Sequence, residues 1–542
     1  MKSKFNYKVP ILIAVVAIIG IIAGTKLKGT SKTNNGGDPK TKLLEILQLI
    51  DREYVDKPDD EKISDAAITA MLKELDPHSV YIPITEVQAN NEDLIGNFEG
   101  IGVEFNLLND TIVVVTPISG GPSEQVGIRS GDRIIKIDGK LVAGVKFKNE
   151  DVFKNLRGKK GTKVTVSIQR RDDKKLVDIT ITRDKIPIFS VDASYMAAPS
   201  VGYIKINRFS GTTIKEYIKA MTILKGKGMK NLILDLRGNP GGFLNAAFQL
   251  ADDYLQDNKL VVYTEGRNRT REEYNATSAG NFEKGKLIIL IDEGSASASE
   301  IVSGSVQDWD RALIIGRRSF GKGLVQEPFR LSDGSEVRLT VARYYTPSKR
   351  SIQRSYKGGV DDYYEDMNRR FEHGELYSKD SSSKDQDTVA YYTASKRIVY
   401  GGGGIMPDIF VPLDTTGNSK YLNQLFNKGI INDFILNHLD KNRDNLKAKY
   451  KNFEEFNNKW VADDQFVKLL TSYATANKLP LDEKGLKNSN TIIKIQLKAL
   501  IARQLYGGDA YYEVINVLNE SYNVALKAMS DNTFDKMKIN YK

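Results

Sequence analysis

Three serines stand two residues apart around the start of a predicted helix: Ser295, Ser297 and Ser299. They follow an apolar stretch at residues 287–291, typical of a buried strand, and open a helical pattern over residues 297–309. A helix N-terminus offers unpaired N–H groups and a positive dipole end, which stabilise an oxyanion. A serine here is a candidate nucleophile for acyl transfer. Most serines at helix starts only cap the helix, and the residues alone do not choose among the three.

A lysine between two glycines, Lys322, lies 25 residues after Ser297 in the stretch GRRSFGKGLVQ. The spacing from Gly316 to Lys322 also suits a phosphate-binding P-loop, which would favour a nucleotide-dependent enzyme. That motif needs Ser or Thr after the lysine, whereas Gly323 follows here, and Pro328 opposes the helix that should come next. Flanking glycines allow close backbone approach, so Lys322 is either a surface charge or a residue held close to another segment.

Composition excludes several other chemistries. The chain has no cysteine, which excludes a thiol nucleophile, a thiolate metal site, a disulfide framework and a lipoprotein cysteine. With only three histidines, His78, His373 and His438, we expect no zinc site and no other cofactor. Of the net charge of +10, residues 1–40 carry +6 through seven lysines and one aspartate. The nearly neutral remainder argues against nucleic-acid binding.

Taken together, GSASASEI and SFGKGLVQ resemble the carboxyl-terminal processing peptidases, also called tail-specific proteases. The resemblance spans about residues 41–415 and implies that Ser297 is the nucleophile, Lys322 the general base and Gln326 the residue that orients the lysine. The stretch LILDLRGNPGG resembles the glycine loop of the family. It implies an oxyanion hole made by the N–H groups of Ala298 and Gly242, with Gly241 as the alternative to Gly242.

A lysine base makes a physical demand, because it must be neutral to accept the Ser297 proton. An unperturbed lysine has a pKa of about 10.4, so half-neutrality near pH 7 needs a shift worth roughly 4 kcal/mol. Burial disfavours the charged form and supplies shifts of that size, so we expect Lys322 to be desolvated. The three histidines are the rival bases, but none matches a role in the family.

Residues 96–185 change to short β-type runs separated by glycine-rich turns, and they resemble a PDZ domain. The resemblance rests on GIRSGDRIIKIDG and on a loop that would bind a peptide carboxylate, formed by Gly100, Ile101, Gly102 and Val103. The strand edge beside that loop would pair with the peptide. We therefore expect protein substrates with apolar C-terminal tails. Arg157, in NLRGKKG, aligns with an arginine proposed to link the PDZ domain and catalytic centre in similar proteases, and is a candidate gating residue or a surface arginine.

Beyond residue 186, predicted strands and helices alternate, which favours an α/β core. The family resemblance implies a core of the crotonase and Clp-protease type. We predict a multidomain chain: a linker at 28–40, a helical segment at 41–95, the PDZ domain at 96–185, the catalytic core at 186–415 and a helical region at 416–542. Polar residues at 355–400 predict a surface excursion within the core.

The N-terminus predicts a membrane anchor, residues 1–27 with their flanks. Lys2, Lys4 and Lys8 precede an apolar run over residues 9–24, and more lysines follow it. That run gives roughly 24 Å of helix against a hydrocarbon core of about 30 Å, and snorkelling lysines would extend it. No clear cleavage site is present, so we favour an uncleaved signal anchor with the body outside the cytoplasm, periplasmic or on the outer face of the bacterial inner membrane.

The sequence therefore predicts a membrane-anchored serine endopeptidase that recognises its substrates by their C-terminal tails and cleaves them with a Ser297–Lys322 dyad. The alternative is a non-proteolytic scaffold that uses the PDZ domain to hold protein C-termini in the cell envelope. Homo-oligomers and an adaptor protein stay open as partners.

Overall fold

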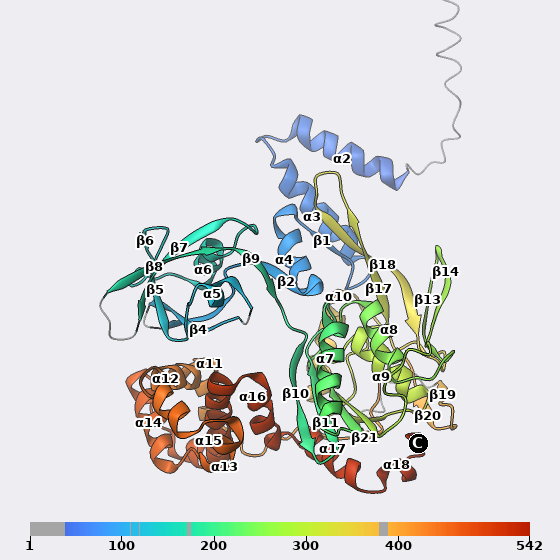
Figure 1. Ribbon diagram of the computed structural model, residues 1–542. Helices are drawn as coiled ribbons and strands as arrows, with labels where there is room; N and C mark the ends of the chain where they lie inside the picture. Colours follow the sequence, from blue (N-terminus) through green and yellow to red (C-terminus); the bar gives the residue numbers. More distant parts are fainter. Residues whose placement is uncertain (1–37, 109, 119, 171–174, 379–388) are drawn as a thin grey trace, which may run out of the picture. The chain divides into compact units, whose positions relative to one another are not determined.

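The computed structural model describes residues 38–108, 110–118, 120–170, 175–378 and 389–542 (Figure 1). The chain divides into two compact units, residues 1–70 and 71–542. The first unit contains helix α2 (Pro39–Glu53) and most of α3 (Asp60–Lys73), as the helical pattern predicts. The last residues of the predicted linker belong to α2, because Asp38 caps this helix and Pro39 fits its first position.

The predicted anchor at residues 1–27 and the linker up to residue 37 lie outside the described residues. Over the described residues, no helix combines the length and the apolar character needed to cross a membrane.

The predicted α/β core is confirmed as a six-stranded sheet in the order β10-β11-β12-β15-β16-β21. All strands after β10 are parallel to their neighbours, and β10 pairs antiparallel with β11 at one edge. The inner strands are mainly apolar, and β15 (LIILI) is wholly so, because both faces of the sheet are covered. Their bounds are β10 (Val191–Ala198), β11 (Val201–Ile206), β12 (Asn231–Asp235), β15 (Leu287–Ile291), β16 (Leu313–Gly316) and β21 (Ile409–Phe410).

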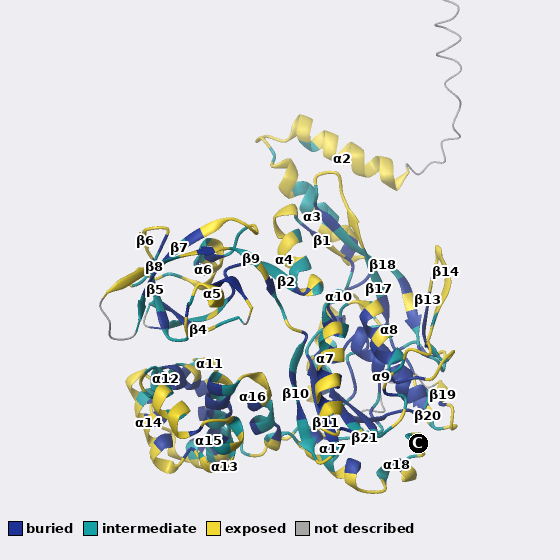
Figure 2. Cartoon of the chain, in the orientation of Figure 1, coloured by how far each residue is buried: buried dark blue, intermediate teal, exposed yellow. Residues whose placement is uncertain are grey.

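Helices from distant parts of the chain cover the two faces of this sheet. One face packs against α7 (Thr213–Gly226), α8 (Leu244–Asp252) and α9 (Ala298–Asp308). The other packs against the end of the chain, with α17 (Glu520–Ser530) and α18 (Thr533–Lys536). Figure 2 shows the dark blue of buried residues concentrated in α9 and the strands around it. The region predicted as helical, residues 416–542, is helical, and its last part packs against the core sheet.

A second sheet lies beside the first and has the order β1-β18-β13-β14, with β17 also paired to β18. Its strands are β1 (Val80–Ile82), β13 (Leu260–Gly266), β14 (Arg269–Asn275), β17 (Leu324–Arg330) and β18 (Glu336–Tyr345). Helix α4 (Ile84–Ile95) follows β1. The loop that carries Lys322 leads directly into β17, so this sheet fixes the position of the lysine.

The described part of the polar stretch at 355–400 is mostly exposed, as a surface excursion predicts, but it also has regular structure and buried charges. It forms α10 (Val360–Glu372), β19 (Ala390–Tyr392) and β20 (Ile398–Tyr400). Arg370 in α10 is buried and pairs with buried Glu375, which also pairs with buried Arg318. Charged residues enter the interior here because each has an ionic partner, which polarity along the sequence does not reveal.

The predicted PDZ block forms a small β domain. Its sheet runs β3-β4-β5-β7-β8, with β3 at one edge and β6 paired to β5. The strand pair β2 (Asn97–Gly100) and β9 (Asp184–Pro187) connects the domain to the rest of the chain. The remaining elements are β3 (Val103–Leu108), β4 (Thr111–Pro117), α5 (Pro122–Gln125), β5 (Asp132–Ile137), β6 (Lys140–Leu141), α6 (Asn149–Leu156), β7 (Lys163–Arg170) and β8 (Leu176–Thr182).

A separate helical domain precedes the last two helices and has its own apolar core. Leu425, Phe456, Ile493 and Leu497 are fully buried in that core. The domain consists of α11 (Lys420–Asn427), α12 (Ile430–Lys449), α13 (Phe453–Lys459), α14 (Asp464–Ala476), α15 (Glu483–Tyr506) and α16 (Gly508–Ile515), followed by the short η2 (Asn516–Leu518).

Candidate active site

The three candidate serines differ in their access to substrate. Ser295 and Ser299 are fully buried, and their hydroxyls donate to the carbonyl oxygens of Leu236 and Asn239, each at 2.9 Å. Ser297 is only half-buried and lines a cavity of about 800 Å³. Of the three, Ser297 alone has its hydroxyl available for chemistry.

Ser297 has an unusual backbone conformation, with φ 54° and ψ −113°. Such a conformation is costly for a residue with a Cβ, and it persists only where surrounding contacts enforce it. The Ser297 N–H donates to the Glu300 carboxylate at 2.8 Å, and α9 begins at the next residue. The turn at Ser297 is therefore held by a side chain of the helix that it opens.

Glu300 also holds the loop that carries Lys322. The same Glu300 oxygen that accepts from Ser297 accepts the Lys322 N–H at 2.9 Å, and the other oxygen accepts the Gly321 N–H at 2.7 Å and the Ser319 hydroxyl. Sequence reasoning missed Glu300, although an acid three residues after a helix-capping serine is a recognisable capping-box signal. One buried carboxylate thus fixes both segments of the predicted dyad.

Tyr344 supplies a second tie between the same two segments. Its hydroxyl lies 3.0 Å from the Ser297 carbonyl oxygen and 2.6 Å from that of Lys322. Sequence reasoning also missed Tyr344, which sits within β18 and gives no local signal of its position. The segment after Lys322 is β17 rather than a helix, so the P-loop interpretation of Gly316 to Lys322 has no structural support.

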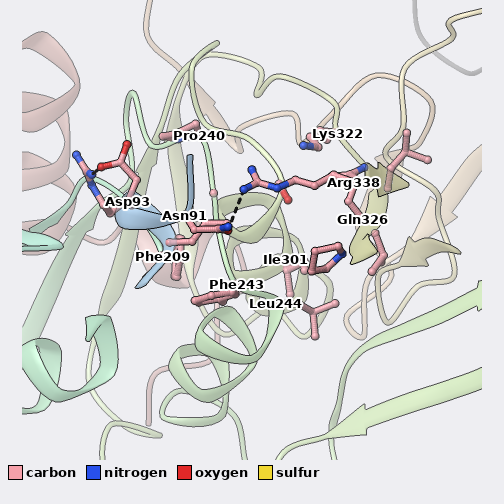
Figure 3. A pocket seen from close by; sticks show the side chains of 18 of the residues that line it. Asn91, Asp93, Phe209, Pro240, Phe243, Leu244, Ile301, Lys322, Gln326 and Arg338 are labelled. Atoms are coloured by element: carbon pink, nitrogen blue, oxygen red, sulfur yellow. Dashed lines mark hydrogen bonds and ion pairs between the residues drawn. The ribbon is translucent and has the colours of Figure 1, made fainter. Parts of the chain in front are cut away.

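Lys322 lines the same cavity as Ser297, and Figure 3 shows its side chain with Gln326 and Arg338 among the residues around that cavity. Burial lowers the pKa of Lys322 below its ordinary value, while the negative charges of Glu300 and Asp76 oppose this shift. Burial also raises the pKa of Glu300 to about 7, against the hydrogen bonds that it accepts. The direction for Lys322 is the one that a general base requires.

Gln326 lines the cavity but makes a different contact from the predicted one. Its amide nitrogen donates to the Thr340 hydroxyl at 3.3 Å, and that hydroxyl donates to Asp76 at 3.1 Å. Within the described part of the chain, no hydrogen bond joins Gln326 to Lys322. The chain Gln326–Thr340–Asp76 brings the turn at residues 75–79 into the site, which sequence reasoning did not foresee.

The backbone around Ser297 distinguishes the two glycines proposed for the oxyanion hole. The Gly241 N–H donates to the Asn239 side chain at 2.9 Å. The N–H groups of Gly242 and Ala298 have no acceptor among the residues that the structure describes. Gly241 instead allows the loop to pack closely against Ser297, because a Cβ on Gly241 would lie 2.8 Å from the Ser297 Cβ. The geometry therefore favours Gly242 and Ala298 as the oxyanion donors.

A charged cluster supports the start of the glycine loop, and sequence reasoning missed it. Arg237 donates two hydrogen bonds to the Asp235 carboxylate at the end of β12, and Tyr203 donates a third at 2.6 Å. Although burial opposes it, the charges of Arg237 and Lys205 hold the pKa of Asp235 well below its usual range. The sequence signal for this cluster was the pair of opposite charges, Asp235 and Arg237, at the end of a buried strand.

None of the three histidines lines this cavity. Burial and the nearby charge of Lys322 lower the pKa of His78 to about 4, and its Nε2 lies 2.9 Å from the Tyr363 hydroxyl. His373 ends α10, and His438 packs against Phe434 and Phe466 in the helical domain. Within the described ranges, no group of three His, Cys, Asp or Glu side chains could hold a metal ion.

The predicted carboxylate loop has features suited to a peptide C-terminus. Ile101 and Gly102 lie between β2 and β3, and their N–H groups donate to no acceptor in the described part of the chain. Gly102 has φ 73°, and a Cβ there would meet the Ile186 side chain at 2.8 Å. Val103 begins β3, the edge strand of the sheet, so an unpaired strand edge continues from the loop.

Arg157 is not a free surface residue. Its guanidinium lies over the rings of Phe98 and Phe153, at 4.7 and 5.1 Å from their centroids. It also forms an ion pair of 2.6 Å with Glu92 on α4, and the neighbours of Glu92 in α4, Asn91 and Asp93, line the Ser297 cavity. Arg157 therefore connects the end of α6 with a wall of the cavity.

Comparison with known proteins agrees with this geometry. Residues 200–365 match the model of peptidase family S41, residues 100–181 match a PDZ domain, and residues 421–507 match a family of unknown function, DUF8443. The carboxy-terminal processing protease CtpA of Bacillus subtilis (strain 168) is 34% identical over 385 residues, which cover 69% of this chain and 82% of that protein. The chain belongs to the family of carboxy-terminal processing proteases.

This protease is also 37% identical over 342 residues to the "Probable CtpA-like serine protease" of Staphylococcus aureus (strain N315), across 62% of this chain and 67% of that protein. A solved photosystem II D1 C-terminal processing protease is 27% identical, with a TM-score of 0.35, and covers 69% of this chain and 93% of that one. Because the chain belongs to the family of carboxy-terminal processing proteases, the protein is a serine-type endopeptidase of this type, and the non-proteolytic scaffold is not favoured.

Proposed function

We propose that Ser297 is the nucleophile of this endopeptidase and Lys322 its general base. The observation that carries the proposal is the shared cavity: Ser297, the accessible serine of the three, opens into it together with Lys322, whose pKa burial lowers. The N–H groups of Gly242 and Ala298, which find no acceptor in the described part of the chain, support an oxyanion hole.

The reaction follows nucleophilic catalysis. Neutral Lys322 Nζ takes the proton from Ser297 Oγ, which attacks the carbonyl carbon of the scissile peptide bond. The N–H groups of Gly242 and Ala298 stabilise the oxyanion that forms. When the C–N bond breaks, the Lys322 ammonium returns the proton to the leaving amine. Lys322 then deprotonates a water molecule, which hydrolyses the acyl ester and releases Ser297.

The apolar lining of the cavity supports a preference for apolar residues around the scissile bond. Phe209 and Ile301 contribute to that lining, and Figure 3 shows Phe243 and Leu244 along the same wall. Gln326 lines the same cavity as Lys322 and would help to position the lysine through the hydrogen bonds that link it by way of Thr340 to Asp76.

The PDZ domain supplies the recognition of substrate tails. The free N–H groups of Ile101 and Gly102 would bind the terminal carboxylate, with Gly100 and Val103 completing the loop, and the edge of β3 would pair with the tail residues before it. Arg157 would couple this event to the active site through Glu92 and α4. If Arg157→Ala leaves activation by apolar-tailed peptides unchanged, the coupling is refuted.

The remaining part of the proposal concerns location. The lysine-flanked apolar run at residues 9–24 supports an N-terminal anchor that keeps the catalytic body outside the cytoplasm. Protease protection of the body in intact cells, compared with lysed cells, tests it. A body that resists added protease until the inner membrane is lysed would refute the extracytoplasmic location.

The test of the dyad is degradation of an unfolded protein with an apolar C-terminus by the full chain and its variants. Ser297→Ala and Lys322→Ala should abolish cleavage while keeping the circular dichroism of the wild type. Lys219→Ala is the matched control, because Lys219 is an exposed lysine on α7 of the same core. Full activity of Lys322→Ala would show that another group is the base.

A further inference from the structure

The groove of the PDZ domain has a second wall, contributed by the helical domain of unknown function. A cavity of about 490 Å³ extends along β3 and α6. Its lining includes Val103, Phe105 and Phe153 on the PDZ side and Gly429, Asn432 and Asp433 at the start of α12. The helical domain borders this groove without filling it.

Ion pairs and apolar contacts join the helical domain to the PDZ domain. Arg503 of α15 pairs with Glu104 of β3 at 3.1 Å, and Asp440 of α12 pairs with Arg133 of β5 at 2.7 Å. The apolar side chains between these ion pairs are buried and face one another across the two domains: Leu108, Val113, Leu436 and Leu439. The two domains therefore meet through a buried apolar patch and two ion pairs.

The charge of the groove indicates what it binds. Its ionisable lining residues are Glu104 and Asp433, and Arg503 already compensates Glu104. Asp433 makes no ion pair with any residue that the structure describes, and burial raises the pKa of its carboxyl group without an opposing cation. Asp433 also lies in the first turn of α12, where the helix dipole favours a carboxylate. Its stabilising effect on the helix dipole does not explain why Asp433 also lines the groove.

We propose that the PDZ and helical domains bind the substrate tail together, and that Asp433 selects tails with a lysine or arginine upstream of the apolar C-terminus. This rests on the proposed function, in which the PDZ groove holds the tail. A tail paired antiparallel to β3, with its carboxylate at the loop, extends along the strand at about 3.3 Å per residue. Its upstream residues therefore lie beside the later part of β3.

The experiment measures binding of fluorescein-labelled peptides to the full chain carrying Ser297→Ala, which prevents cleavage. The peptides end in the same apolar residues and carry Lys, Gln or Glu at successive upstream positions. At one or two adjacent positions, Lys should bind about fivefold tighter than Gln, as for a partly exposed ion pair, and Glu should bind more weakly. Asp433→Asn should remove this preference, and Asp433→Lys should reverse it.

Glu483→Gln is the matched control, because Glu483 is an exposed acid in the first turn of α15 and does not line the groove. It should keep the wild-type preference. If apolar-ended peptides bind equally well whatever their upstream residue, or if Asp433→Asn keeps the preference, the composite groove is refuted while tail binding stands. If no apolar-ended peptide binds, tail recognition by the PDZ domain fails as well.

Discussion

Glu300 offers the sharpest test of how the active site is held together. Its carboxylate accepts the N–H groups of Ser297, Lys322 and Gly321 and the hydroxyl of Ser319. In Glu300→Gln, the single amide oxygen can keep the Ser297 and Lys322 N–H groups. The amide NH2 must then face the Gly321 N–H, while the Ser319 hydroxyl can turn to accept. One buried N–H is left without an acceptor.

An unsatisfied buried N–H costs about 1–3 kcal/mol. Because Gly321 directly precedes Lys322, we expect much of this cost to appear as misplacement of the base. If all of it reaches the transition state, kcat falls by about tenfold to a hundredfold, since each 1.4 kcal/mol is tenfold. Glu300→Ala leaves three N–H groups without an acceptor, and both its kcat and its stability should fall further.

The assay combines steady-state cleavage of a fluorogenic unfolded substrate with urea unfolding of the same preparations. Glu216→Gln is the matched control: Glu216 accepts the Ser190 and Val191 N–H groups at 2.7 and 2.9 Å and the Thr212 hydroxyl, away from the cavity. It should lose some stability and keep its kcat. Wild-type kcat in Glu300→Gln, together with a folded and active Glu300→Ala, would refute the positioning role.

Three further predictions address the base, the rival histidine and the end of the chain. Because only the neutral form of Lys322 acts as a base, kcat/KM should fall as the pH drops through the lowered pKa of Lys322, and a pH-independent rate would contradict this assignment. His78→Gln should retain turnover. It should lose about 1 kcal/mol of stability in urea unfolding, because it loses the contact with Tyr363. If the variant is folded but inactive, His78 is again a candidate for the base. Phe534→Ala should lower the free energy of unfolding by about 3–5 kcal/mol, because Phe534 is fully buried against the core sheet, whereas a change below about 1 kcal/mol would show that α18 is not part of the core.

Much of the fold could be predicted because its signals are local. The buried strands β11, β12 and β15 are mainly apolar, and the turn before α9 has small residues beside an apolar strand. The stretch at 355–400 could not be predicted in the same way. Its buried charges, Arg370 and Glu375, are stable inside only through partners that the chain brings together by folding.

The site shows the same division. Ser297 and Lys322 were found through motifs, but their spacing says nothing about Glu300 and Tyr344, which join them in space. The choice between Gly241 and Gly242 depends on which N–H is already used by Asn239, and that contact exists only in the folded loop. The packing of α17 and α18 on the core sheet also escaped the sequence, because an amphipathic helix does not indicate which surface it covers.

The most direct test of the Ser297–Lys322 dyad is reaction of the full chain with a fluorophosphonate, followed by mapping of the modified residue by mass spectrometry. The reagent forms a bond from serine Oγ to phosphorus and releases fluoride, so it reports the activated hydroxyl without a protein substrate. We predict modification of Ser297 and of neither Ser295 nor Ser299, at a rate that rises with pH and is lost in Lys322→Ala. Modification of a different residue, or an unchanged rate in Lys322→Ala, would contradict the assignment.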